Sequence, residues 1–233
     1  SVAVGYQALA FQNFTTATNS HNTAVGHLAG NRVTTGLNNA LFGAAAGDVL
    51  TDADQNTALG AFSLTTDTLG SKSTAVGRSA LEQQNFTTAT DSNNTAVGYD
   101  SGAKVTTGTG NTLIGASAGD GLTGNANNTA VGFSALSAAS AGASCTAIGA
   151  NALLAATGNE NTALGVNAGN VIVGGANNII IGVNADPSGS NNSNQIVIGR
   201  EVTGTGNNNF TFGGGTSDSN ICLLYTSPSP RDS

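Results

Sequence analysis

The chain has 233 residues, of which 8% are charged, against about a quarter in an ordinary soluble domain. It contains 33 Gly, no Trp and no Met, and carries a net charge of −7. This charge argues against nucleic acid or an anionic membrane as a partner, because both require basic patches. No apolar run reaches the roughly 20 residues of a membrane span. Val, Ile, Leu and Thr recur at fixed places, which favours an ordered, β-rich chain over disorder.

A short motif recurs from the first residues onward. It reads "NTAVG" at 22–26, 94–98 and 128–132, and "NTALG" at 56–60 and 161–165. Most of its closing glycines recur at a spacing of 17 in the numbering, with two gaps of 21 and one of 16. A fixed period of this length predicts a solenoid. The closing glycines are Gly5, Gly26, Gly43, Gly60, Gly77, Gly98, Gly115, Gly132, Gly149, Gly165, Gly182 and Gly199.

A longer repeat lies over the short one. Residues 1–72 align without a gap with residues 73–144, and both copies carry the same four-residue expansion around "QNFTTAT", at 12–18 and 84–90. We therefore divide the chain into a repeat domain at 1–206, with Ile-rich final coils at 171–206, and a shorter terminal coil or the start of another module at 207–221. Because the sequence opens inside a motif, we expect it to be part of a longer protein.

Each 17-residue unit is too short for two helices, and Gly, Asn and Thr are poor helix formers. We expect two short strands and two turns per coil, with the second strand in stretches such as 32–35 and 104–107. Stacked coils predict an all-β fold: a parallel β-roll or β-helix solenoid of about 12 coils.

Alternation along the motif strand defines two apolar columns. We expect the larger residues, one before each glycine, to form the core. The smaller residues, two before it, are then left for the face of a partner chain, which predicts a homotrimer. The reverse arrangement, with alanine inside and the larger column against the neighbour, stays open. The expected core is Val25, Phe42, Leu59, Val76, Val97, Ile114, Val131, Ile148 and Leu164, and the expected oligomer face is Ala24, Ala58, Ala75, Ala96, Ala130, Ala147 and Ala163.

The two expansions are the candidate receptor-contact loops. Phe14 and Thr15 lie in the first, and Phe86 and Thr87 stand at the equivalent positions of the second. The two loops should therefore project from the same side of a stacked solenoid. The alternative is a longer turn whose Phe folds back onto the edge of the roll.

Catalytic and metal-binding groups are sparse. His21 and His27 are the only histidines, and no GxSxG, HExxH or P-loop motif is present. Cys145 stands where the motif usually has Asn, which favours a small structural residue. We expect neither enzymatic activity nor a cofactor nor a metal site.

The last residues differ from all the others. The stretch 222–233, which opens on Cys222, matches nothing upstream and looks like a translated sequencing adapter. We interpret it as an artefact.

The motif "NTAVGxxAL/NTAVGxxAG", carried by residues 1–9 and 22–30, resembles the head repeats of trimeric autotransporter adhesins (YadA-like heads). It is also similar to repeat arrays of phage tail-fibre-like and bacterial surface proteins. The resemblance implies a left-handed parallel β-roll, a homotrimer, and an extracellular place on the bacterial outer surface or in a virion tail fibre. It implies a structural and adhesive fibre segment with a protein or glycan receptor. The period is longer than that of the adhesin heads, so strand and turn lengths do not carry over.

A different function class stays open as the alternative. Thr stands three residues before most of the motif glycines, and a solvent-exposed ladder of this kind would suit an ice-binding or small-ligand-binding solenoid. A carbohydrate-active enzyme on a β-helix would need clustered carboxylates, which the sequence does not show.

Overall fold

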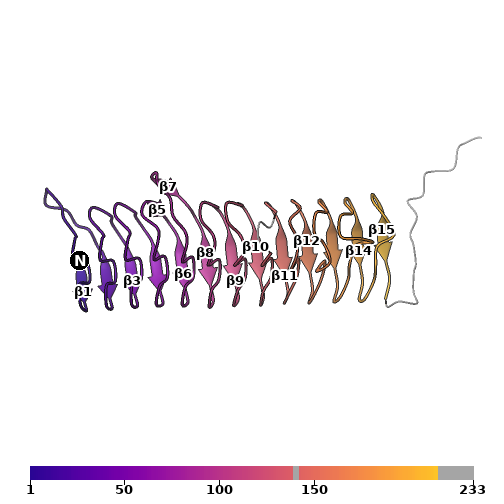
Figure 1. Cartoon of the computed structure of the whole chain (residues 1–233), viewed down its shortest axis with the longest axis horizontal. Helices are drawn as coiled ribbons and strands as arrows, with labels where there is room; N and C mark the ends of the chain where they lie inside the picture. Colours follow the sequence, from indigo (N-terminus) through magenta and orange to yellow (C-terminus); the bar gives the residue numbers. More distant parts are fainter. Residues whose placement is uncertain (139–141, 215–233) are drawn as a thin grey trace, which may run out of the picture.

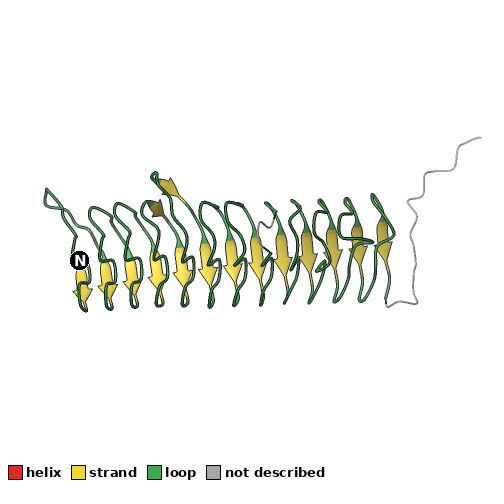
Figure 2. Ribbon diagram, in the orientation of Figure 1, coloured by secondary structure: helices red, strands yellow, loops and turns green. Residues whose placement is uncertain are grey.

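The computed structural model describes residues 1–138 and 142–214. Its main feature is a single parallel sheet of thirteen strands, stacked one per coil along a rod (Figures 1 and 2). Within these ranges no residue is helical, and the predicted parallel β-solenoid with a 17-residue period is confirmed. The strands are β1 (Val2–Val4), β2 (Thr23–Val25), β3 (Ala40–Phe42), β4 (Thr57–Leu59), β6 (Thr74–Val76), β8 (Thr95–Val97), β9 (Thr112–Ile114), β10 (Thr129–Val131), β11 (Thr146–Ile148), β12 (Thr162–Leu164), β13 (Ile179–Ile181), β14 (Ile196–Ile198) and β15 (Phe210–Phe212).

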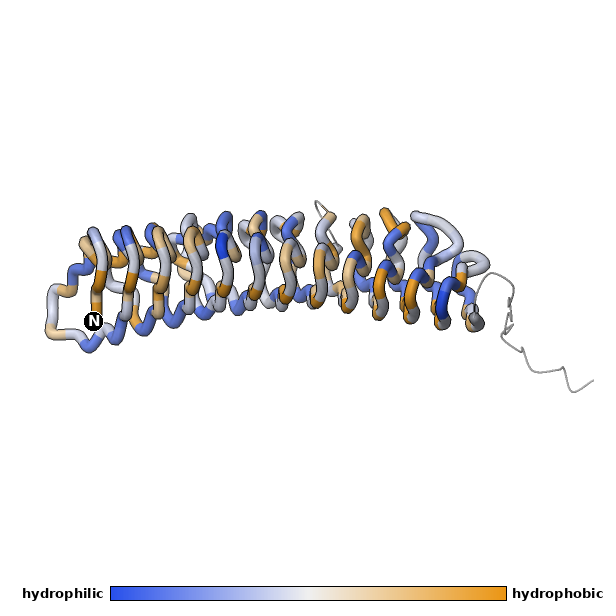
Figure 3. The backbone as a smooth tube through the Cα atoms, turned by 90° about the horizontal axis from the view of Figure 1, so that it is seen from below, coloured by the Kyte–Doolittle hydropathy of each residue, from blue (hydrophilic) through white to orange (hydrophobic). Residues whose placement is uncertain are grey.

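The register of the sheet follows the sequence repeat. Thr129, Ala130 and Val131 of β10 pair with the equivalent residues of β11, one period later, and the same holds along the sheet. The longer gaps keep this register, because the four extra residues leave the stack as a loop: β6 pairs with β8 in step. Figure 3 shows the result as hydrophobic segments that recur once per coil along the axis.

The predicted second strand is absent from stretches 32–35 and 104–107. These residues form turns, and their backbones still bond to the next coil, as from Thr34 N to Thr51 O at 2.9 Å. Left-handed residues stand on either side of each stretch, at Gly30 and Asn38 and at Gly102 and Gly110, so each stretch is only a short connection between two bends. The one other sheet in the described ranges joins β5 (Gly70–Ser71) to β7 (Thr90–Asp91), beside the second expansion.

The two apolar columns are the reverse of the core and partner faces predicted above. From β2 to β14 the middle residue of each strand, usually Ala, points inward and is fully buried, whereas the residue after it points outward: Leu59 is 49% and Leu164 47% exposed. The expected core of Val25, Phe42, Leu59, Val76, Val97, Ile114, Val131, Ile148 and Leu164 is therefore outside, and Ala24, Ala58, Ala75, Ala96, Ala130, Ala147 and Ala163 line the interior. The arrangement left open as the alternative is the one observed.

The reason lies on the far side of each coil. A Leu four residues after the motif glycine, such as Leu64 or Leu81, fills the interior from that side, so the strand contributes only a methyl group. Other coils have Gly there and place an apolar residue three positions later, as with Gly47 and Leu50. The Leu41 side chain of β3 fills the space beside Gly30 and Gly47. A Cβ added at Gly30 would lie 2.6 Å from Leu41 Cδ1, and one added at Gly47 would lie 2.9 Å from Leu41 Cδ2.

Buried polar residues connect the coils at the start of each strand. Asn22 Oδ1 accepts a bond from Asn39 N at 2.8 Å, and Asn22 Nδ2 donates to Gly36 O at 2.7 Å. The same pair of bonds recurs for Asn39 and Asn56. These amides satisfy the backbone of the inner turn, where water does not reach.

Candidate functional site

The outward face of the main sheet is uncharged in the described strands and carries one continuous column of large apolar residues. Two residues of each strand point outward: the larger apolar residue, and the residue two before it, which is Thr in most strands. No charged residue occupies either position in the main-sheet strands from β1 to β15. Thirteen three-residue strands at about 4.8 Å spacing cover roughly 600 Å². Roughly half of this strip is the apolar column, an exposed patch within the range of the largest patches on typical monomers, which are often functional.

Aromatic residues extend this face around the corner that follows the motif glycine. Tyr6, Tyr99 and Phe133 all stand one residue after that glycine and are more than half exposed. Tyr6 stacks on His27 with ring centroids 5.3 Å apart, and the Arg78 guanidinium lies over both Phe62 and Tyr99. The corner therefore adds exposed apolar area next to the sheet.

The second expansion loop is anchored by a buried carboxylate. Asp67, fully buried, accepts bonds from Gly70 N, Phe86 N and Gln84 Nε2, at 3.0, 3.1 and 2.6 Å. Gln84 Oε1 accepts from Asn94 Nδ2 at 2.8 Å. Phe86 folds back over Gly70 and is 6% exposed. Its predicted role in receptor contact is wrong, because its ring faces the roll.

The first expansion loop has the same sequence without this anchor. Gln12 Nε2 is buried and has no partner among the described residues. Phe14 is half-buried, and Thr15 is exposed, as is Thr87 in the second loop. Receptor contact by Phe14, Thr15 and Thr87 stays a prediction.

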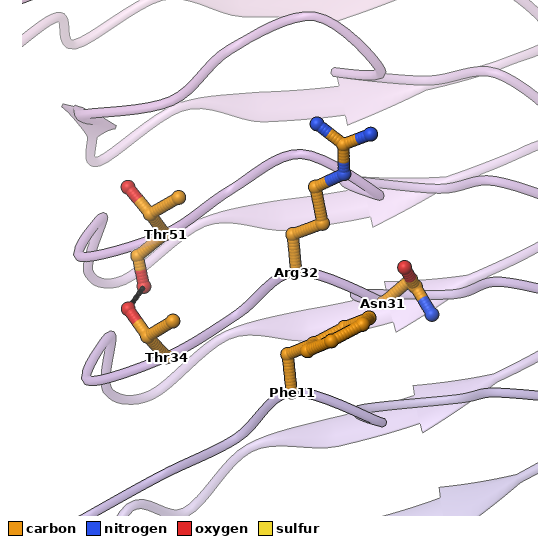
Figure 4. Close-up of a pocket in the computed structure, with 5 residues that line it drawn as sticks. All are labelled: Phe11, Asn31, Arg32, Thr34 and Thr51. Carbon is orange, nitrogen blue, oxygen red and sulfur yellow. Dashed lines mark hydrogen bonds between the residues drawn. The ribbon is translucent and has the colours of Figure 1, made fainter.

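A groove lies on a different side of the rod, among turns that contain no strand residue. It has a volume of about 460 Å³ and is lined by Phe11, Asn31, Arg32, Thr34 and Thr51 (Figure 4). The sequence analysis missed it. The signal was available, since Phe11 and Arg32 both stand six residues after a motif glycine and so lie side by side on consecutive coils.

Titratable groups do not gather into a reaction centre in ranges 1–138 and 142–214. No three His, Cys, Asp or Glu side chains there are placed to hold a metal ion, and no helix could cross a membrane. Burial raises the pKa of Asp48, Asp120 and Asp186, which stand apart on different coils. Cys145 is buried, and burial raises its thiol pKa, which disfavours the reactive thiolate. The tail at 222–233 lies outside the described residues.

Comparison with known proteins gives no match, either to a family model or to a curated protein.

Proposed function

We propose that this chain is a structural and adhesive segment of an attachment fibre, extracellular on a bacterial surface or in a virion tail fibre. The observation that carries the proposal is the uncharged outward face with its column of large apolar residues, continuous over thirteen strands. Copies of the chain cover this face and together form a stiff rod. The resemblance of the repeat to trimeric adhesin heads and tail-fibre arrays supports a homotrimer.

The outward face suits association with copies of itself. All strands run parallel at one spacing, so a second copy presents the same apolar steps at the same intervals. A roughly 600 Å² strip, widened by the aromatic corner, approaches the roughly 800 Å² per partner of a stable interface. Attachment is then the task of the loops on the remaining sides and of the groove.

The test compares charge placed on this face with charge placed elsewhere. The double variant Val97→Glu, Ile114→Glu puts two carboxylates in the outward column, and Thr107→Glu puts one on an exposed turn. Melting temperature should rise with protein concentration for the wild type and for Thr107→Glu, because association stabilises the fold by mass action. The double variant should lose this dependence and keep its β-type circular dichroism. Concentration-independent melting of the wild type would refute self-association.

One observation favours the alternative function. The Thr column lies on the outward face rather than inside, and its members are half-buried or exposed in the single chain. A regular Thr array on a flat parallel sheet is the geometry an ice-binding surface needs. Ala40, Ile179 and Ile196 interrupt the array. Thermal hysteresis in a monomeric sample would support this alternative against the fibre.

A further inference from the structure

The groove beside Phe11 is lined by an aromatic ring, a basic side chain and three polar uncharged side chains. Phe11 is 61% exposed, and its ring reaches toward Asn31, whereas the Arg32 side chain extends from the same region toward the next coil (Figure 4). Thr34 and Thr51 stand on one side of this pair and Asn31 on the other. Phe11 N donates to Asn31 O at 3.0 Å, which holds the first coil against the second at this point.

The polar side chains of the groove already make hydrogen bonds within the protein. The Thr34 hydroxyl donates to Thr51 O, and the Thr51 hydroxyl donates to Thr68 O, both at 3.1 Å. Their protons are thus committed to the protein. Figure 4 shows both hydroxyl oxygens on the side away from Phe11 and Arg32, and both methyl groups on the side toward them. Asn31, nearly buried, donates to Gln7 O at 3.1 Å and so forms a fixed wall.

Arg32 supplies a positive charge without an ionic partner. Three basic residues of ranges 1–138 and 142–214 form ion pairs, namely Lys72, Arg78 and Arg200. Arg32 and Lys104 do not, and they occupy the same place in the two 72-residue copies. Burial raises the pKa of Asp48, and the charge of the Arg32 guanidinium lowers it in part, but the two side chains form no ion pair. Donors of the guanidinium therefore remain for a ligand.

The second copy shows which residues make the groove distinctive. Its Thr106 and Thr123 match Thr34 and Thr51, whereas Phe11, Asn31 and Arg32 are replaced by Gln83, Ala103 and Lys104. The second copy thus keeps the backbone and the hydroxyls but lacks the aromatic ring, the amide and the planar guanidinium. It is an internal control within the same molecule.

We propose that this groove binds an acidic sugar unit of a glycan. The apolar face of a pyranose ring packs on Phe11, as sugars do on exposed aromatic rings. The sugar carboxylate takes a bidentate bond from Arg32, whose fork matches that geometry where a Lys does not. The methyl groups of Thr34 and Thr51 form the side wall of the groove next to the sugar. This inference rests on the proposed adhesive function, because the acidic glycan would be the receptor to which the fibre attaches.

The experiment uses two sugars that differ in one group. Methyl glucuronide carries a carboxylate where methyl glucoside has a hydroxymethyl group. The full chain is titrated with each sugar, and binding is measured by calorimetry or NMR. The glucuronide should bind about tenfold more tightly, because a charge-assisted hydrogen bond contributes more binding free energy than a neutral one. Arg32→Gln should remove the difference between the two sugars. Phe11→Gln should weaken both, and Lys104→Gln should change neither.

Placing the same three residues in the second repeat tests whether they are sufficient for sugar binding. The triple variant Gln83→Phe, Ala103→Asn, Lys104→Arg copies them into the second repeat and should raise the stoichiometry from one sugar per chain to two. All the variants lie on turns, and unchanged melting temperatures would show that they fold. Equal binding of both sugars, no binding by the wild type, or binding that survives Phe11→Gln would each overturn the proposal. The association test does not involve this groove, so a fibre that self-associates without binding sugar would refute the site alone.

Discussion

At the scale of single residues, the motif glycines set the distance between coils. Gly98 has φ of +142°, and a Cβ there would lie 2.4 Å from Gly115 O of the next coil. The glycine thus meets two demands, a backbone conformation that only glycine adopts readily and a close approach of the next coil. The same contact recurs along the column, as between Gly60 and Gly77.

We expect Gly98→Ala to lower the free energy of unfolding by at least about 3 kcal/mol, because the strain and the clash add together. Gly124→Ala is the matched control. Its Cβ would meet only Thr107 Oγ1 at 3.4 Å, so we expect a change below about 1 kcal/mol. Urea unfolding measures both. Equal stability of the two variants would show that the coils are not held this closely.

Asp186 gives the fold a pH dependence. Burial raises its pKa above 3.8, and bonds from the Val171 and Asn170 backbones oppose the rise in part. The folded state therefore holds this proton more tightly than the unfolded state. The stabilisation from protonated Asp186 is complete below the pKa of this carboxyl in the unfolded chain, and it is lost as pH rises through its pKa in the folded chain.

It follows that Asp186→Asn, which keeps an acceptor oxygen but removes the charge, should melt at a higher temperature than the wild type at pH 7. The gap should close toward pH 3. Thr107→Ser, at an exposed position, adds and removes no ionisable group and serves as control: its melting temperature should differ from the wild type by the same amount at both pH values. A lower melting temperature for Asp186→Asn at pH 7 would contradict the assignment.

At the scale of elements, the two expansion loops show how one sequence acquires two environments. Gln84 Nε2 donates to the Asp67 carboxylate at 2.6 Å and to Ser73 Oγ at 3.0 Å, whereas Gln12 Nε2 has no partner. Asp67, one coil before Gln84, is thus what anchors the second loop.

These loops offer a paired experiment. Gln84→Ala leaves Asp67 buried with fewer donors and should cost about 2–4 kcal/mol of stability. Gln12→Ala removes the same side chain where it bonds only Ser1 and should cost less than about 1 kcal/mol. Comparable losses in urea unfolding would show that the Asp67 network does not anchor the second loop.

The sequence predicted the coil, its period and its parallel register, because a periodic chain leaves few other ways to stack. It did not predict which apolar column is inside. Alternation shows that Ala58 and Leu59 face opposite ways, but the interior volume depends on what the far side contributes, here Leu64. Asp67 gave no signal of its own, although it stands one coil before Gln84. The groove depends on side chains from adjacent coils, which the motif does not include.

At the scale of the whole molecule, stability and function follow from repetition. Each coil contacts only its neighbours, so rigidity grows with the number of coils and loops on the outside can vary without cost to the stack. Reversal of the columns moves the expected partner surface from the alanines to the larger residues. A carboxylate at Ala96 or Ala130 would now break the interior and not an interface.

The central claim is that copies of this chain cover the outward face. The most direct test is the mass of the wild-type chain in solution at micromolar concentration, measured by light scattering after size exclusion. The account predicts a multiple of the chain mass of 22.7 kDa, threefold for the trimer. A well-folded species at 22.7 kDa over the whole concentration range would contradict it.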